Sequence, residues 1–227
     1  MDRVLIIAAH PDDEVLGMGG TIAKYAAAGA EIALLIVTDG SSSQYQGSDD
    51  LAAIIERKKQ ETQACASVLG IGSVYYGGLP DMRLDVTPHI QINAAIEKVV
   101  AEFAPNIVYT HFYGDVNKDH QCVYESTLVA CRPVMGQKVK RIFAYSVPSS
   151  TEWNIQTEKA VFMPNWYEDI SGVFAEKKYE GFAQYKTELR PYPHPRSTEH
   201  LRQVDIAEGL RVGLGAAESF MLLRSLT

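Results

Sequence analysis

The stretch Arg-Val-Leu-Ile-Ile-Ala-Ala-His-Pro-Asp-Asp-Glu, residues 3–14, decides how the rest of the chain is interpreted. Its apolar part is short, continuous and rich in branched side chains, which predicts a strand buried in a parallel sheet. Charge then begins abruptly, with an imidazole, a proline and three carboxylates in five positions. Open α/β sheets bind their ligands outside the carboxyl ends of their strands, so this junction is a candidate site.

The residues at this junction are suited to holding a metal ion. His10 and Asp13 are three positions apart across a strand-to-helix turn, so both side chains can reach one cation. Zinc accepts imidazole nitrogen together with carboxylate oxygen, and a catalytic zinc needs three protein ligands and an open position. Asp12 would then act as a base on the bound water. An acidic helix start that complements the helix dipole explains each carboxylate, but not the adjacent histidine, so we favour a metal site.

A second polar segment, residues 110–120, follows another apolar run and reads Thr-His-Phe-Tyr-Gly-Asp-Val-Asn-Lys-Asp-His. Parallel strands bring their carboxyl ends to one edge of the sheet, so we expect this segment to face the turn at His10. His120 is the expected third ligand, which completes a His-Asp-His set with one position left for water. Asp119, next to it, is expected to hydrogen-bond to a ligand side chain without contacting the metal itself.

Length and composition restrict the class of protein. The 227 residues, 46% of them hydrophobic, predict one globular domain over residues 1–227. A net charge of −7 argues against nucleic acid as a partner. No apolar run approaches the ~20 residues of a membrane helix, and the first residues do not form a signal peptide. Three cysteines without a framework spacing indicate reduced thiols and a cytoplasmic protein.

Alternating strand and helix patterns predict an α/β fold, a Rossmann-like three-layer sandwich with a mostly parallel central sheet and helices on both faces. The glycine cluster at 17–20 would let the first helix lie close to the sheet, and the polar segment 41–50 is expected to be a loop at the ligand edge. Strands are predicted at 3–9, 31–38, 73–76, 106–111, 140–147 and within 160–171, and helices at 16–28, 51–69, 88–103, 121–131 and 172–189.

The run His-Pro-Asp-Asp-Glu at residues 10–14, with two glycines at 19–20, resembles the signature of the LmbE-like (PIG-L) zinc de-N-acetylases. That family removes acetyl groups from N-acetylated amino sugars and their conjugates. The resemblance implies a zinc-dependent hydrolase for such a substrate, with a metal-activated water and Asp12 as general base. Relatives are often hexamers, so it also implies a homo-oligomer.

The resemblance extends along nearly the whole chain. Arg57, four positions before Glu61, matches a family arginine and would contact a substrate phosphate or hydroxyl group. The run His-Pro-Arg-Ser at 194–197 matches one branch of the family and makes His194 and Arg196 candidate substrate contacts. A structural or subunit-contact role is the alternative for both residues.

One segment departs from the family's pattern. Many relatives carry His-Pro-Asp-His, in which the first histidine polarises the scissile carbonyl, whereas residues 117–120 read Asn-Lys-Asp-His. Asn117 can donate a hydrogen bond to an oxyanion, but it cannot carry a proton. His111 or His194 would supply that function, and His111 is also a candidate substrate contact. The candidate catalytic residues are therefore Asp12, Asn117 and Asp119.

Two other functions stay open. A non-catalytic Rossmann-like module that binds a sugar or nucleotide would need neither Asp12 nor an open metal position. An amidase acting on a thiol conjugate or another amide would use the same ligands with a different pocket. A phosphoesterase is disfavoured because two-metal enzymes need more bridging carboxylates. The ligand set also suits divalent ions other than zinc.

Overall fold

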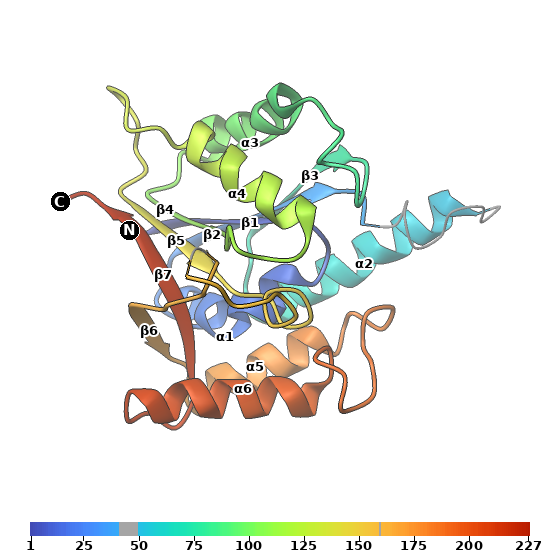
Figure 1. Ribbon diagram of the computed structural model, residues 1–227, viewed down its shortest axis with the longest axis vertical. Coiled ribbons are helices and arrows are strands. Elements are labelled where there is room, and N and C mark those ends of the chain that lie inside the picture. The colour runs from blue at the N-terminus through green and yellow to red at the C-terminus, as the bar shows by residue number, and fades with distance from the viewer. Residues whose placement is uncertain (41–49, 159) are drawn as a thin grey trace.

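The computed structural model describes residues 1–40, 50–158 and 160–227, so the loop expected at 41–50 lies outside the described residues except at its end. The strands of the described part are β1 (Arg3–Ala8), β2 (Glu31–Thr38), β3 (Ser73–Leu79), β4 (Ile107–His111), β5 (Arg141–Tyr145), β6 (Trp166–Asp169) and β7 (Ala217–Ser225). They form one sheet in the order β3-β2-β1-β4-β5-β7-β6 (Figure 1). Strands β1 to β5 are parallel, whereas β7 is antiparallel to both β5 and β6.

Helices cover both faces of this sheet. They are α1 (Asp13–Ala27), α2 (Leu51–Leu69), α3 (His89–Phe103), α4 (Lys118–Ala130), α5 (Val173–Phe182) and α6 (Thr198–Arg211). Helices α3 and α4 lie on one face, and α1, α2, α5 and α6 lie on the other (Figure 1). This arrangement confirms the predicted Rossmann-like three-layer sandwich. Among the described residues, no helix has both the length and the apolar character needed to span a bilayer.

The first strand shows why its sequence is apolar at every position. Alternate side chains of a strand point to opposite faces of the sheet. Since helices cover both faces, β1 contributes to two separate hydrophobic cores and needs apolar residues on each side. Residues 4, 6 and 8 enter the core under α1 and α5, and residues 5, 7 and 9 enter the core under α3 and α4. All six side chains are fully buried.

The glycine cluster lets α1 lie directly against its neighbours, as predicted. A β-carbon at Gly17 would overlap the ring of Tyr145 at the end of β5. A β-carbon at Gly20 would meet the side chain of Ile170 at 2.8 Å. Side chains at these positions would therefore push α1 away from the sheet edge that carries the polar residues.

Helix α1 is kinked, and a distant carboxylate stabilises the kink. Met18 has non-helical backbone angles (φ −156°, ψ 24°), so the amides just after it lack helical partners. The backbone amides of Gly20 and Thr21 instead donate to Glu218 in β7, at 3.0 and 2.7 Å. The buried ammonium of Lys178 lies 2.9 Å from the same carboxylate. The end of the chain thus fixes the first helix.

Several element boundaries differ from the predictions. Helix α4 begins at Lys118, three residues earlier than expected, because the Asn117 side chain caps it by accepting from Asp119 N at 2.9 Å. The helix expected over 172–189 ends at Phe182. The sequence analysis did not foresee α6, which Ser197 caps, or strand β7. The assignment of residues 1–227 to a single domain stays a prediction.

Candidate metal centre

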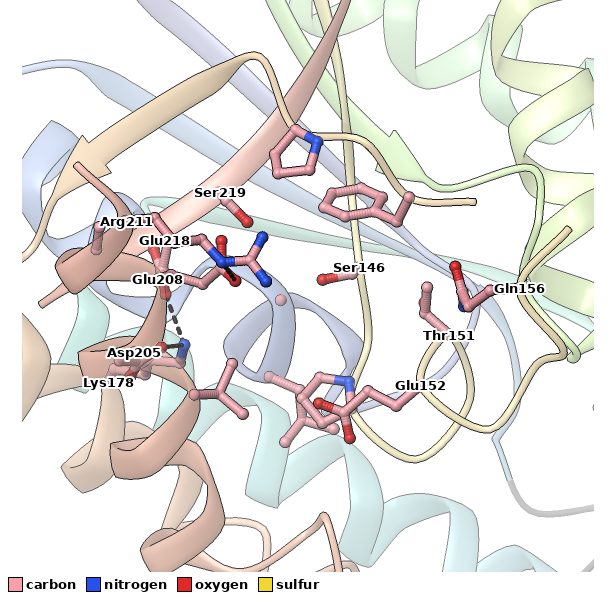
Figure 2. Close-up of a pocket in the computed structure, with 17 residues that line it drawn as sticks. Ser146, Thr151, Glu152, Gln156, Lys178, Asp205, Glu208, Arg211, Glu218 and Ser219 are labelled. Atoms are coloured by element: carbon pink, nitrogen blue, oxygen red, sulfur yellow. Dashed lines mark hydrogen bonds and ion pairs between the residues drawn. The ribbon is translucent and has the colours of Figure 1, made fainter. Parts of the chain in front are cut away.

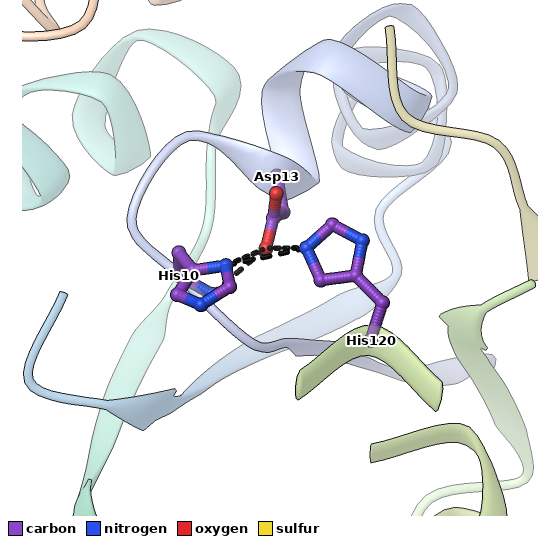
Figure 3. Close-up of side chains that lie close together, drawn as sticks. All are labelled: His10, Asp13 and His120. Atoms are coloured by element: carbon purple, nitrogen blue, oxygen red, sulfur yellow. Dashed lines mark hydrogen bonds and ion pairs between the residues drawn. The ribbon is translucent and has the colours of Figure 1, made fainter. Parts of the chain in front are cut away.

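Three predicted ligands meet at the carboxyl edge of the sheet. The turn after β1 carries His10 and leads into α1, whose first residue is Asp13, while the first turn of α4 carries His120 (Figure 3). His10 Nδ1 lies 3.2 Å from His120 Nε2. Asp13 Oδ2 lies 3.3 Å from each of these two nitrogens. Residues more than a hundred positions apart in the chain therefore present three donor atoms to one point.

The spacing of these atoms fits a tetrahedral ion. Zinc bound to nitrogen and oxygen at about 2.0–2.1 Å has ligand atoms about 3.3–3.4 Å apart, which is the edge of the tetrahedron. The three separations match that edge, and the donors are the two imidazole nitrogens and one carboxylate oxygen that zinc accepts. Asp13 and His120 are buried, whereas the side chain of His10 is 13% exposed. The set thus has one accessible side.

The candidate ligand His120 is held in place by a carboxylate and by a second histidine. Its Nδ1 lies 3.1 Å from Asp115 Oδ2, and Asp115 in turn accepts from Thr151 Oγ1 at 2.7 Å. Its ring stacks on that of His111, with centroids 3.9 Å apart. A carboxylate behind a ligand histidine fixes the ring orientation and raises its basicity. Asp115 was not among the predicted site residues, and the Gly-Asp-Val-Asn run at 114–117 is the sequence pattern that could have pointed to it.

The ligand His10 has an equivalent support. Its Nε2 lies 3.1 Å from Asp119 Oδ2 and 3.3 Å from Asp81 Oδ1. These three residues also form a group with metal-ligand spacing. Asp119, however, already accepts hydrogen bonds from the backbone amides of Met82 and Leu84, at 2.7 and 3.0 Å. We therefore interpret Asp81 and Asp119 as positioning residues for His10.

The electrostatics of the cluster favour a positive charge at its centre. Burial alone would lower the pKa of His120, but Asp13 and Asp115 raise it to about 9. Burial would raise the pKa of Asp13, yet the neighbouring histidines His120 and His111 hold it well below its usual range. In the absence of metal, a proton on an imidazole supplies the positive charge that the carboxylate requires. A metal ion would displace that proton on binding.

Asp12 combines three features that are typical of residues at functional sites. Its backbone lies in the left-handed region (φ 105°), which is strained for a non-glycine residue. The side chain is buried, and Oδ2 has no hydrogen-bond partner within the described parts of the chain. Burial raises the pKa of Asp12, and Arg196, with Nη1 3.6 Å away, opposes this effect. Strain, burial and a shifted pKa cluster at functional sites.

A cavity of about 60 Å³ opens beside His10 and contains charges that the sequence did not reveal. Glu188 lies between Lys58 and Arg196, with Oε1 2.7 Å from Lys58 Nζ and Oε2 2.8 Å from Arg196 Nη1. Lys58 and Glu188 read as solvated charges in the sequence, so nothing local marked them. The lining residues are His10, Pro11, Asp12, Gly40, Lys58, Asp81, Met82, Asn117, Glu188 and Arg196.

The other predicted site residues occupy different positions. His111 is fully buried and its Nε2 accepts from Ala9 N at 2.8 Å, so it supports the site from within rather than facing the cavity. The side chain of Arg57 is 62% exposed and pairs with Glu61 at 3.5 Å on the surface of α2. His194 Nδ1 accepts from the backbone amide of Arg196 at 3.0 Å. Neither Arg57 nor His194 is among the residues that line the cavity.

The fold and this cluster define an α/β protein with a candidate mononuclear metal centre at the carboxyl ends of β1 and β4. The family model described as PIG-L, GlcNAc-PI de-N-acetylase, matches residues 5–131. The chain therefore belongs to the PIG-L family. The matched region includes all three predicted ligands and ends before the segment that carries Glu188 and Arg196.

Individual relatives extend the similarity. The chain is 30% identical over 192 residues to the protein named uncharacterized deacetylase YaiS of Escherichia coli K12, covering 81% of this chain and 90% of that protein. It is 31% identical to diacetylchitobiose deacetylase of Thermococcus kodakarensis, over 47% of this chain and 39% of that protein. It is 30% identical to 1D-myo-inositol 2-acetamido-2-deoxy-alpha-D-glucopyranoside deacetylase of Rhodococcus jostii, over 56% of this chain and 52% of that protein.

Solved structures share the whole fold. The conserved protein TT1542 of Thermus thermophilus superimposes with a TM-score of 0.78 at 22% identity, covering 100% of this chain and 97% of that one. GalB of Pseudomonas putida KT2440, a 4-carboxy-2-hydroxymuconate hydratase, superimposes with a TM-score of 0.77 at 20% identity. The match covers 100% of this chain and 98% of that one. At these identities the likeness shows the fold, including α6 and β7, and not the reaction.

Proposed function

We propose that this protein is a metal-dependent hydrolase that removes the N-acetyl group from an N-acetylated amino sugar or its conjugate. The observation that carries the proposal is the set of donor separations, 3.2, 3.3 and 3.3 Å, between His10, Asp13 and His120 beside a strained and buried Asp12. Membership of the PIG-L family and the names of the relatives support the choice of an acetamido sugar as substrate.

The three ligands would hold zinc or another divalent ion. When bound, such an ion would polarise the amide carbonyl and make a water molecule acidic. Asp12 would accept the proton of the attacking water and later return it to the leaving nitrogen, so the carboxylate is regenerated. Burial, which raises the pKa of Asp12, makes its carboxylate a stronger base than an exposed one.

Other residues of the cavity would act on the carbonyl oxygen and on the rest of the substrate. Asn117 lines the cavity, and its amide nitrogen, which donates to Met82 Sδ at 3.5 Å in this structure, would donate to a developing oxyanion. Lys58 and Arg196 line the same cavity and are paired with Glu188, so they would contact substrate oxygens without carrying unbalanced charge. Asp119 and Asp115 would act only through the ligand histidines.

Metal analysis coupled to an acetate-release assay tests the proposal. The purified protein is expected to bind one equivalent of zinc and to release acetate from at least one member of a panel of acetamido sugars and sugar conjugates. His120→Ala is expected to lose both the metal and the activity. Stoichiometric metal without acetate release from any panel member would contradict the proposed substrate class, and the absence of metal binding would contradict the proposed site.

A further inference from the structure

A larger cavity, of about 190 Å³, lies on the other side of the segment that follows β5. Residues from the 146–156 segment form one wall, and residues from α5, α6 and the start of β7 form the opposite wall (Figure 2). None of the described residues lines both this cavity and the one beside the candidate metal centre. The two cavities are nevertheless neighbours at the carboxyl edge of the sheet, where α/β proteins bind their ligands.

The walls of this cavity carry an excess of negative charge. Lys178 is buried between two carboxylates, with its Nζ 2.7 Å from Asp205 Oδ1 and 2.9 Å from Glu218 Oε1. One ammonium therefore balances only one of these two anions. Arg211 pairs with Glu208, and its Nε lies 3.3 Å from Glu208 Oε1. Three carboxylates of the lining therefore face two cations, since the fourth, Glu152, pairs with His200 Nε2 at 3.0 Å, and the field in such a recess favours a cationic ligand.

One of these carboxylates has an unused acceptor. Glu208 Oε2 is buried and has no hydrogen-bond partner in the described residues. The side chain as a whole is 17% exposed, so it is partly buried in the cavity wall. A buried carboxylate oxygen without a donor is costly, and a protonated amine in the cavity would supply that donor.

The rest of the lining offers neutral polar groups and apolar surface. Ser146, Ser219 and Gln156 contribute hydroxyl and amide groups around the cavity (Figure 2). Leu16, Phe162 and Val204 contribute apolar surface. Most of the lining residues are charged or polar, so the cavity suits a small polar molecule rather than an apolar one. A volume of about 190 Å³ is enough for one sugar-sized molecule.

We propose that the cavity between the 146–156 segment, α6 and β7 is a second ligand site, which binds a small hydroxylated primary amine in its protonated form. The ammonium group would donate to Glu208 Oε2, and the hydroxyl groups would pair with the serine and glutamine side chains. The inference rests on the charges and the unpaired oxygen of this cavity, and it holds whether or not the metal centre deacetylates sugars.

Calorimetric titration of the full-length protein with glucosamine at neutral pH tests the proposal. Glucosamine is expected to bind, and glucose, which lacks the ammonium group, is expected to bind at least about tenfold more weakly, as the loss of a charge-assisted hydrogen bond implies. Glu208→Gln is expected to weaken glucosamine binding by a similar factor. The matched control is Glu199→Gln, which removes an exposed carboxylate from the first turn of the same helix.

Two further variants keep the test decisive. Val204→Phe fills the cavity without changing its charge and is expected to abolish binding, while thermal melting verifies that each variant is folded. Asp12→Asn alters the metal-side cavity and is expected to leave the affinity for glucosamine unchanged. The proposal is overturned if glucose binds as tightly as glucosamine, if Glu208→Gln binds like the wild type, or if Asp12→Asn removes the binding.

Discussion

Replacing Asp12 by asparagine tests the assignment of the general base. The side chain is buried and its Oδ2 has no hydrogen-bond partner among the described residues, so an amide of the same shape fits and loses only the ion pair with Arg196 Nη1 at 3.6 Å. Removal of a positioned base typically costs about 10²–10⁴ in rate, which corresponds to about 3–5 kcal/mol in the activation barrier. Because burial raises the pKa of Asp12, a neutral side chain should not lower stability.

The assay is acetate release under kcat/KM conditions, with zinc content and melting temperature measured on the same preparations. Asp12→Asn is expected to retain its zinc and its melting temperature while losing activity by the factor given above. The matched control is Asp13→Asn, in which the oxygen 3.3 Å from both histidine nitrogens loses its charge, and this variant is expected to lose the metal itself. Wild-type kcat/KM in zinc-loaded Asp12→Asn would refute the reasoning.

Three other perturbations have defined outcomes. Burial raises the pKa of Glu14 to about 7, so in metal-free protein its contribution to stability is present below pH ~4.5 and is lost as the pH rises through ~7. The free energy of unfolding should fall by about 3 kcal/mol over this range, as measured by chemical denaturation, and the Glu14→Gln variant should lack this pH dependence. Lys178→Met removes the cation between two buried carboxylates and should lower the melting temperature by roughly 10 °C, whereas Lys177→Met, at an exposed pair, should change it little. Without metal the pKa of His120 is about 9 and that of His10 is also raised, so zinc must displace their protons. The apparent affinity in a chelator competition should therefore fall at least about tenfold for each pH unit below 9, and a flat profile would contradict the assignment of the histidine ligands.

The network around Glu188 gives the cavity its shape. Glu188 connects Lys58 on α2 with Arg196 on the loop before α6, and Arg196 Nε also donates to Ser149 Oγ at 3.1 Å. Burial would raise the pKa of Glu188, but Lys58 and Arg196 hold it below its usual range, so the carboxylate stays charged. Removal of one member of such a buried network leaves the others unpaired, which is more costly than the contact itself.

The sequence by itself predicted the parallel part of the sheet and the three candidate metal ligands. The apolar run before His10 predicts a doubly buried strand, and the polar residues that follow must then lie at its carboxyl end. The same reasoning applied to the run before His120, so two local patterns and one rule of parallel sheets brought the ligands together. Family resemblance added the reaction class, but it also led to Arg57, which the structure leaves on the surface of α2.

Only the tertiary structure decided which charges line the cavity and how the C-terminal part of the chain folds. Lys58 and Glu188 follow patterns identical to those of solvated helix residues, and their burial depends on elements more than a hundred residues apart in the chain. Glu218 lies 198 positions from Gly20 in the chain, and it accepts a hydrogen bond from the Gly20 backbone amide at the kink of α1. Periodicity reports only the neighbours of a residue along its own element, whereas ion pairs and caps of this kind arise from packing between elements.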